Sequence, residues 1–182
     1  MDESSIRDKL FSNQLKVLRG NFDTIGDTSY LTIFLDNLMA EEKISFALYV
    51  KVRAHGQQEA WFLPLMAAEE VLELSWVGML KKLGIDRLYF QRKDLDAVIA
   101  YLNNRLLLLD INQENQVKEK LLVLVEHLNL TLLRAFNSPH LGRHVRLAQI
   151  QVERLVGILQ RDTTALKLVW KLLFKDYTLS TI

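Results

Sequence analysis

Residues 86–106 read DRLYFQRKDLDAVIAYLNNRL, and the hydrophobic periodicity changes within this stretch. The first five residues, 86–90, are rich in aromatic and aliphatic side chains and are short enough to form one β-strand. From Lys93 onwards, apolar residues recur at helical spacing, on a stripe formed by Leu95, Val98 or Ile99, Leu102 and Leu106. The stretch therefore predicts that a part containing strands ends near residue 92 and that a helical part begins at residue 93.

The part before residue 93 has the pattern of a small mixed domain. Residues 46–52 alternate so that Phe46, Leu48 and Val50 share one face, which is typical of a half-buried strand. The apolar spacing predicts a helix over 71–83 that ends at Gly84 as its C′ residue, and we expect a short helix near 6–18. The predicted strands are 30–34, 46–52, 60–65 and 86–90. Strands and helices in this order indicate an α+β domain of about four strands and one or two helices over residues 1–92.

Residues 93–182 are predicted to form a long-helix bundle or a coiled-coil extension. Besides the helix that follows Lys93, the pattern predicts helices over 115–136, from about residue 140, and over 166–174. The helix that begins near residue 140 carries an a/d heptad stripe with spacings of 4, 3, 4, 3 and 4, formed by Leu141, Val145, Ala148, Val152, Leu155 and Leu159. This stripe fits a helix packed within one chain as well as it fits a dimeric seam. We expect a homodimer of micromolar affinity.

Composition argues against several classes of function. Lys and Arg total 23 against 22 Asp and Glu, for a formal net charge of +1, so neither nucleic-acid binding nor a polybasic membrane anchor is expected. The absence of cysteine excludes disulfides, thiolate nucleophiles and Cys-type zinc sites. The N-terminal residues lack a secretory apolar segment, and the most apolar run, 121–125, is too short to span a bilayer. We therefore expect a cytoplasmic protein.

Two segments resemble a known family. Residues 44–50 (ISFALYV), together with 30–33 (YLTI), 84–90 (GIDRLYF) and the Asp94-Leu95 pair, are similar to the small domain that precedes many bacterial HD-GYP modules. Residues 172–181 (LLFKDYTLST) look like the lead-in to the HD-GYP catalytic helices. The His-Asp pair and the Gly-Tyr-Pro motif that name the family do not occur in this sequence.

The resemblance implies a function. It implies that the chain is the non-catalytic regulatory and dimerisation region of a cyclic di-GMP phosphodiesterase, ahead of a metal-dependent HD-type domain in a longer protein. Its helices would transmit an input to that enzyme by changing their packing. The alternative is a stand-alone helical adaptor that binds a partner protein through its apolar faces.

Candidate site residues are few, and no catalytic residue is predicted. The sharpest metal candidate is the i,i+4 pair His140 and His144, but no third ligand is evident, so we expect neither a metal nor another cofactor. His55 and His127 are interpreted as solvated. Three aromatic residues, Tyr49, Trp61 and Tyr89, are candidates to face a small ligand if their side of the sheet stays open, although core packing is the default for such residues.

Overall fold

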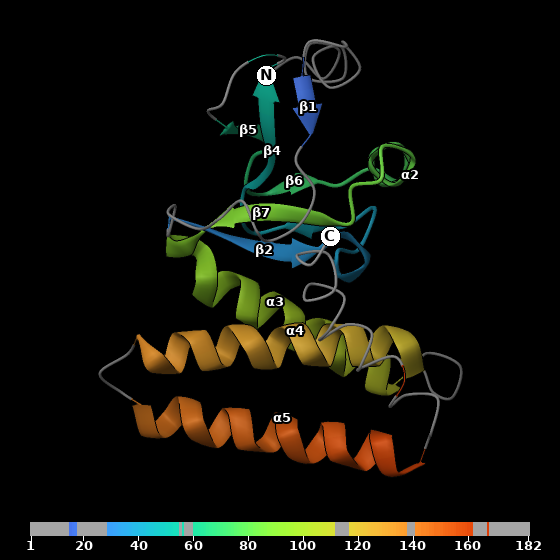
Figure 1. Ribbon diagram of the computed structural model, residues 1–182. Coiled ribbons are helices and arrows are strands. Elements are labelled where there is room, and N and C mark those ends of the chain that lie inside the picture. The colour runs from blue at the N-terminus through green and yellow to red at the C-terminus, as the bar shows by residue number, and fades with distance from the viewer. Residues whose placement is uncertain are drawn as a thin grey trace. The chain divides into compact units, whose positions relative to one another are not determined.

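The computed structural model describes residues 15–17, 29–54, 56, 60–111, 117–137, 141–161 and 167. The chain divides into two compact units, Met1–Asp94 and Leu95–Ile182. The first combines a β-sheet with a helix, and the described residues of the second are helical, so the predicted α+β fold class is confirmed (Figure 1).

The main sheet of the first unit has five strands with antiparallel pairing throughout. The strand order is β1-β4-β7-β2. Strand β5 lies off this path and pairs with β4 along residues 48–53. The strands are β1 (Leu15–Val17), β2 (Tyr30–Phe34), β4 (Leu48–Ala54), β5 (Ala60–Met66) and β7 (Arg87–Gln91). The four strands predicted from sequence are β2, β4, β5 and β7, each within two residues of its predicted start.

One part of the N-terminal prediction was wrong. Residues 15–17 form a strand where a helix over 6–18 was expected, because they pair with residues 52–54 of β4. A tertiary pairing of this kind overrides a weak local preference for helix. Residues 6–14 lie outside the described part of the chain.

One face of the sheet forms the core of the first unit. Its side chains alternate along three strands and are at most 2% exposed, namely Ile33, Leu48, Val50, Val52, Leu88 and Phe90. Phe46 packs near Phe90, with ring centroids 6.0 Å apart. The period-2 pattern in residues 46–52 therefore marks the buried face, as the sequence predicted.

A helix and a small ribbon complete this unit. Helix α2 spans Leu74–Lys82, and Gly84 follows it with φ +70°. The amide of Gly84 donates to the Lys81 carbonyl and the amide of Ile85 to the Leu80 carbonyl, which is the Schellman arrangement that favours glycine. The helix begins three residues later than predicted, because β6 (Glu70–Val71) pairs with β3 (Lys43–Ile44). Two short 3-10 turns, Leu35–Asn37 and Arg92–Asp94, follow β2 and β7.

The second unit contains three long helices in its described residues. They are α3 (Leu95–Ile111), α4 (Val117–Phe136) and α5 (Leu141–Arg161), and α4 packs against both of the others. In Figure 1, α4 and α5 run side by side, joined at one end. Because α4 is covered on two sides, all residues from Leu121 to His127 are buried.

Two arginine–carboxylate pairs tie α3 to α4. Arg134 donates from Nε and a terminal nitrogen to the two carboxylate oxygens of Asp96, at 2.7 and 3.0 Å, on a largely exposed surface. Arg105 pairs with Glu119, and this guanidinium is buried. The Arg134–Asp96 pair is two-pronged, which fixes geometry as well as adding attraction. The Arg105–Glu119 pair is a single contact, and it joins the same two helices in antiparallel orientation.

Candidate functional site

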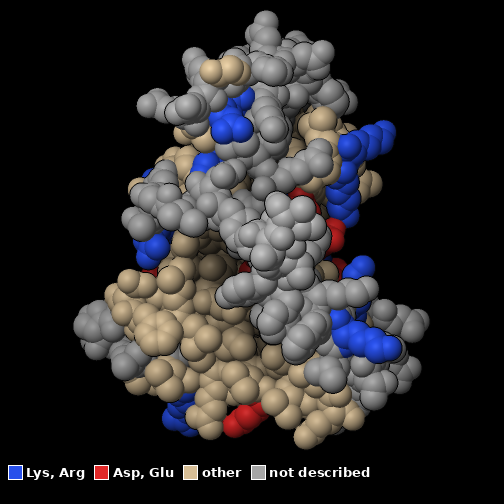
Figure 2. Space-filling model, viewed as in Figure 1, with Lys and Arg blue, Asp and Glu red and all other residues tan. Residues whose placement is uncertain are grey.

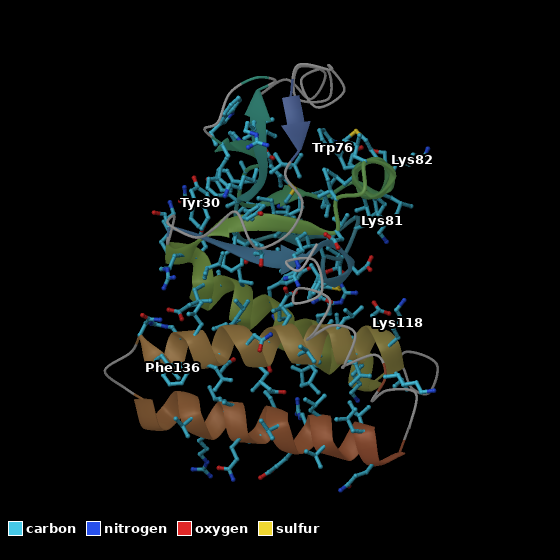
Figure 3. All side chains as sticks on the ribbon, viewed as in Figure 1. Tyr30, Trp76, Lys81, Lys82, Lys118 and Phe136 are labelled. Carbon is cyan, nitrogen blue, oxygen red and sulfur yellow. The ribbon has the colours of Figure 1, made fainter. Side chains whose placement is uncertain are left out.

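A cavity of about 600 Å³ lies in the first unit, between the end of β5, the ribbon strand β6 and the start of α2. That volume suits a small organic molecule. The lining includes Tyr49, Pro64, Met66, Glu70, Glu73 and Trp76. Trp76 projects from α2, where Figure 3 labels it.

A β-bulge shapes the wall that β5 contributes to this cavity. Leu48 pairs with Met66, but the next residue, Tyr49, pairs with Pro64, which leaves Leu65 as the extra residue. A bulge bends its strand and redirects side chains, and proline is tolerated in a strand at such a site. The bulge therefore places Pro64, Leu65 and Met66 together on the cavity wall.

Two glutamates hold the turns beside the cavity. Glu41 and Glu69 have φ of 65° and 67°, a region that residues other than glycine rarely adopt. The Glu41 carboxylate accepts a hydrogen bond at 2.6 Å from the amide of Leu74, the first residue of α2, while the Glu69 amide donates to the Ile44 carbonyl at 2.8 Å. These bonds anchor the ribbon and the helix start that form one side of the cavity.

The three aromatic candidates have different surroundings. Tyr49 lines the cavity, and burial, with smaller contributions from Tyr30 and Asp94, raises the pKa of its phenol. Tyr89 is 2% exposed and packs edge-on against Phe62 at 5.1 Å, whereas Trp61 is 38% exposed and does not line the cavity. The structure therefore does not bring the three around one cavity.

Sequence reasoning missed Glu70, Glu73 and Trp76 as residues of one cavity. Their proximity depends on the β3–β6 pairing, which links residues 43–44 to residues 70–71 through two-residue strands. Strands of that length leave no hydrophobic periodicity in the sequence.

A second candidate surface lies on α5. Of the predicted stripe, Ala148 is buried, and Leu155 and Leu159 pack against the core formed by Leu121 and Val125 of α4. Val145 and Val152 are 48% and 44% exposed, and Val156, one helical turn after Val152, is equally open. We call Val145, Val152 and Val156 the α5 ridge. The stripe thus divides between an intrachain contact and an exposed apolar edge.

Uncharged side chains dominate this region. In Figure 2, the described surface over α4 and α5 is mostly tan, with charged atoms at its lower edge and on its right side. Phe136, at the C-terminal end of α4, is 81% exposed, and Figure 3 shows it at that helix end. No described helix is long and apolar enough to cross a membrane.

Only the prediction for His127 falls on a described side chain. His127 was expected to be solvated, and that was wrong: it is 4% exposed, and burial, with a smaller contribution from Arg154, lowers its pKa to about 4. The cause of the error is the position of α4 between two other helices, which leaves little of its surface to solvent. His140, His55 and the side chain of His144 lie outside what the structure describes. Among the described residues, no group of three metal-ligating side chains is present.

Comparisons with known proteins give one weak similarity. No protein-family model and no curated protein matches the chain. Among solved structures, the chain is similar to Bd1817, a HDG"Y"P protein from Bdellovibrio bacteriovorus, with 15% sequence identity and a TM-score of 0.46. The match covers 78% of this chain and 45% of that protein, so the chain spans less than half of the other protein's length. A likeness at this level does not establish the family to which the chain belongs.

Proposed function

We propose that this chain is a non-catalytic regulatory and dimerisation module of an HD-GYP-type signalling phosphodiesterase, and that two copies associate through α5. The resemblance of residues 30–95 and 172–181 to that family supports the signalling role. The α5 ridge carries the dimerisation role, because apolar side chains at a common helical face are exposed where α4 does not cover them.

The ridge fits a two-fold symmetric, antiparallel pairing of α5 with α5 of a second copy. Pairing about a point near residue 150 places Val145 of one copy opposite Val156 of the other. The same operation brings Arg146 of one copy within two residues, about 3 Å along the helix axis, of the position opposite Glu153 of the second copy, twice per dimer. Arg146 and Glu153 are seven residues apart on one side of the ridge, and both are exposed. Apolar contact along the ridge and complementary charges beside it favour a second copy as the occupant.

The expected interface is small. From Val145 to Val156 the helix rises about 16 Å, which limits the area that two ridges can bury. An interface of that size supports a dissociation constant of about micromolar order. Changes in the packing of these helices would then bias an attached enzyme between two states.

Val152→Glu is expected to convert the dimer into a folded monomer. Val152 is 44% exposed, so a carboxylate is tolerated within one chain, but in the dimer it would lose its water against an apolar surface. Sedimentation velocity across a concentration series measures the association, and circular dichroism checks that the helices remain. Gln160→Glu, on an exposed position outside the ridge, adds the same charge and should leave the dimer intact. A wild-type chain that sediments as a monomer at high concentration would refute the proposal.

Exchanging charges tests the antiparallel pairing itself. Arg146→Glu and Glu153→Arg should each weaken the dimer, because either change places like charges opposite each other, and the effect should grow at low salt. The double variant R146E/E153R should restore the association to within about twofold, since the pairs reform with exchanged partners. Additive losses in the double variant would exclude this pairing.

The alternative is an adaptor that binds a different protein. It is favoured by further exposed apolar side chains away from the ridge, at Leu107, Leu108, Phe136, Leu147 and Ile150. An adaptor should remain monomeric alone and should lose partner binding with Phe136→Ser, which the dimer proposal does not require. The two functions are thus separated by the sedimentation of the wild-type chain.

A further inference from the structure

The cavity in the first unit has a one-sided electrostatic character. Glu70 and Glu73 line it, and none of its described lining residues is Lys, Arg or His. One carboxylate oxygen of Glu70 accepts a hydrogen bond from the Ala67 amide at 2.8 Å, and one of Glu73 accepts from the Ser75 hydroxyl at 3.1 Å. The second oxygen of each has no hydrogen-bond partner among the described residues and stays available to a ligand.

This charge distribution selects against anions. Two carboxylates beside an apolar wall raise the energy of a phosphate or carboxylate ligand, since no basic side chain of the lining offsets the repulsion. A cyclic dinucleotide, with two phosphates, is therefore a poor fit for the cavity. A positive charge, by contrast, would be attracted by both glutamates.

The rest of the wall suits a cation that carries an apolar body. Tyr49 and Trp76 contribute aromatic rings, and the faces of such rings attract cations, especially quaternary ammonium groups, because their weak hydration is easily removed. Leu65, Met66 and Leu72 are buried and supply an aliphatic surface beside them. A volume of about 600 Å³ accommodates an ammonium group together with an aromatic or branched body.

We propose that this cavity binds a small organic cation, an amine or quaternary ammonium compound with an apolar body. Its charge lies near Glu70 and Glu73, and its body packs against Tyr49, Trp76 and Met66. The ligand is an input to the first unit. The proposal goes beyond the dimerisation role and is independent of it, because the ridge on α5 belongs to the other unit.

Benzyltrimethylammonium chloride is a suitable probe for the full chain. Nuclear magnetic resonance titration should shift the Trp76 indole N–H resonance, assigned with a Trp76→Phe variant, and give a saturable isotherm at millimolar probe or below. Benzyl alcohol, which lacks the charge, and phenylacetate, which reverses it, should bind at least about tenfold more weakly.

Matched variants test the role of the two carboxylates. Glu70→Gln with Glu73→Gln should weaken binding by about tenfold or more, because glutamine keeps an oxygen for the Ala67 and Ser75 hydrogen bonds but removes the charge. Glu42→Gln removes a nearby exposed carboxylate that does not line the cavity, and it should change the affinity less than about twofold. Trp76→Leu keeps an apolar side chain but removes the aromatic ring, so it should weaken binding. Because this variant lacks the indole signal, its binding is measured on the resonances of neighbouring backbone amides.

The proposal is overturned by any of three results. The first is the absence of a saturable shift at about 10 mM probe, a concentration at which even weak binding is detected. The second is equal binding of benzyl alcohol. The third is equal losses of affinity from Glu42→Gln and from the Glu70/Glu73 double variant. Loss of the dimer in the Val152→Glu chain should leave binding unchanged, so failure here and failure of the dimer proposal are distinguishable.

Discussion

Glu119→Ala is expected to lower the free energy of unfolding of the helical unit by about 2 to 3 kcal/mol. Arg105 of α3 is 5% exposed, and its guanidinium pairs with Glu119 of α4. One terminal nitrogen of Arg105, Nη1, already has no hydrogen-bond partner among the described residues. Removing Glu119 therefore leaves a buried cation without a counter-charge, which costs more than losing the attraction alone.

The second arginine–carboxylate pair is a natural control. Arg134 and Asp96 join the same two helices with two hydrogen bonds, but their side chains are 34% and 69% exposed. Asp96→Ala should cost no more than about 1 kcal/mol, because water solvates the arginine that is left. Urea unfolding with an unchanged m-value measures both losses. Equal losses from the two variants would contradict the view that burial decides the difference.

Removing Arg105 instead of Glu119 should not lower the free energy of unfolding. Arg105→Met replaces a buried cation with an apolar chain of similar length, and Glu119 is exposed enough for water to solvate its carboxylate. The change is expected to be neutral or stabilising by up to about 1 kcal/mol. A double variant lacking both side chains should then resemble Arg105→Met rather than the sum of the two single changes.

The parts of the fold that follow from regular burial could be predicted from sequence. Leu48, Val50 and Val52 face the core of the first unit, and Leu95, Val98 and Leu102 lie on the buried stripe of α3. One-sided burial of a strand or helix leaves a period in the sequence, so β4, β7 and α3 were predicted close to their observed positions. The ribbon of β3 and β6 was not, because two residues contain no period.

Periodicity does not say which neighbour covers a face. Among the described side chains of the heptad stripe on α5, Ala148 is buried and Leu155 and Leu159 pack against α4, whereas Val145 and Val152 are open. The cavity is a similar case. Tyr49 was singled out, yet Glu70 and Trp76 reach it only because the ribbon and the start of α2 close around it. Such contacts depend on tertiary pairing between distant segments.

The stability of the helical unit is expected to fall as the pH drops from 6.5 towards 4, owing to His127. Burial, and to a smaller extent the charge of Arg154, lowers the pKa of His127 to about 4 in the folded chain, against 6.5 for an unperturbed histidine. Between these values the unfolded chain binds a proton that the folded chain does not. The free energy of unfolding therefore decreases with falling pH, by at most about 1.4 kcal/mol per pH unit and on the order of 3 kcal/mol in total. Above pH 6.5 this contribution is fully present, and below pH 4 no more of it is lost.

His127→Gln isolates this contribution from the other three histidines and from the carboxylates. The difference in unfolding free energy between wild type and variant, measured in urea at several pH values, should slope between pH 4 and 6.5 and be flat above. Arg154→Gln should reduce the slope only partly, since Arg154 on α5 is the smaller cause and burial remains. A direct titration of the His127 ring by nuclear magnetic resonance should give a midpoint near pH 4. A midpoint near 6.5 would mean that the proton enters the α4–α5 contact without cost, and that His127 is not buried in solution as it is in the structure.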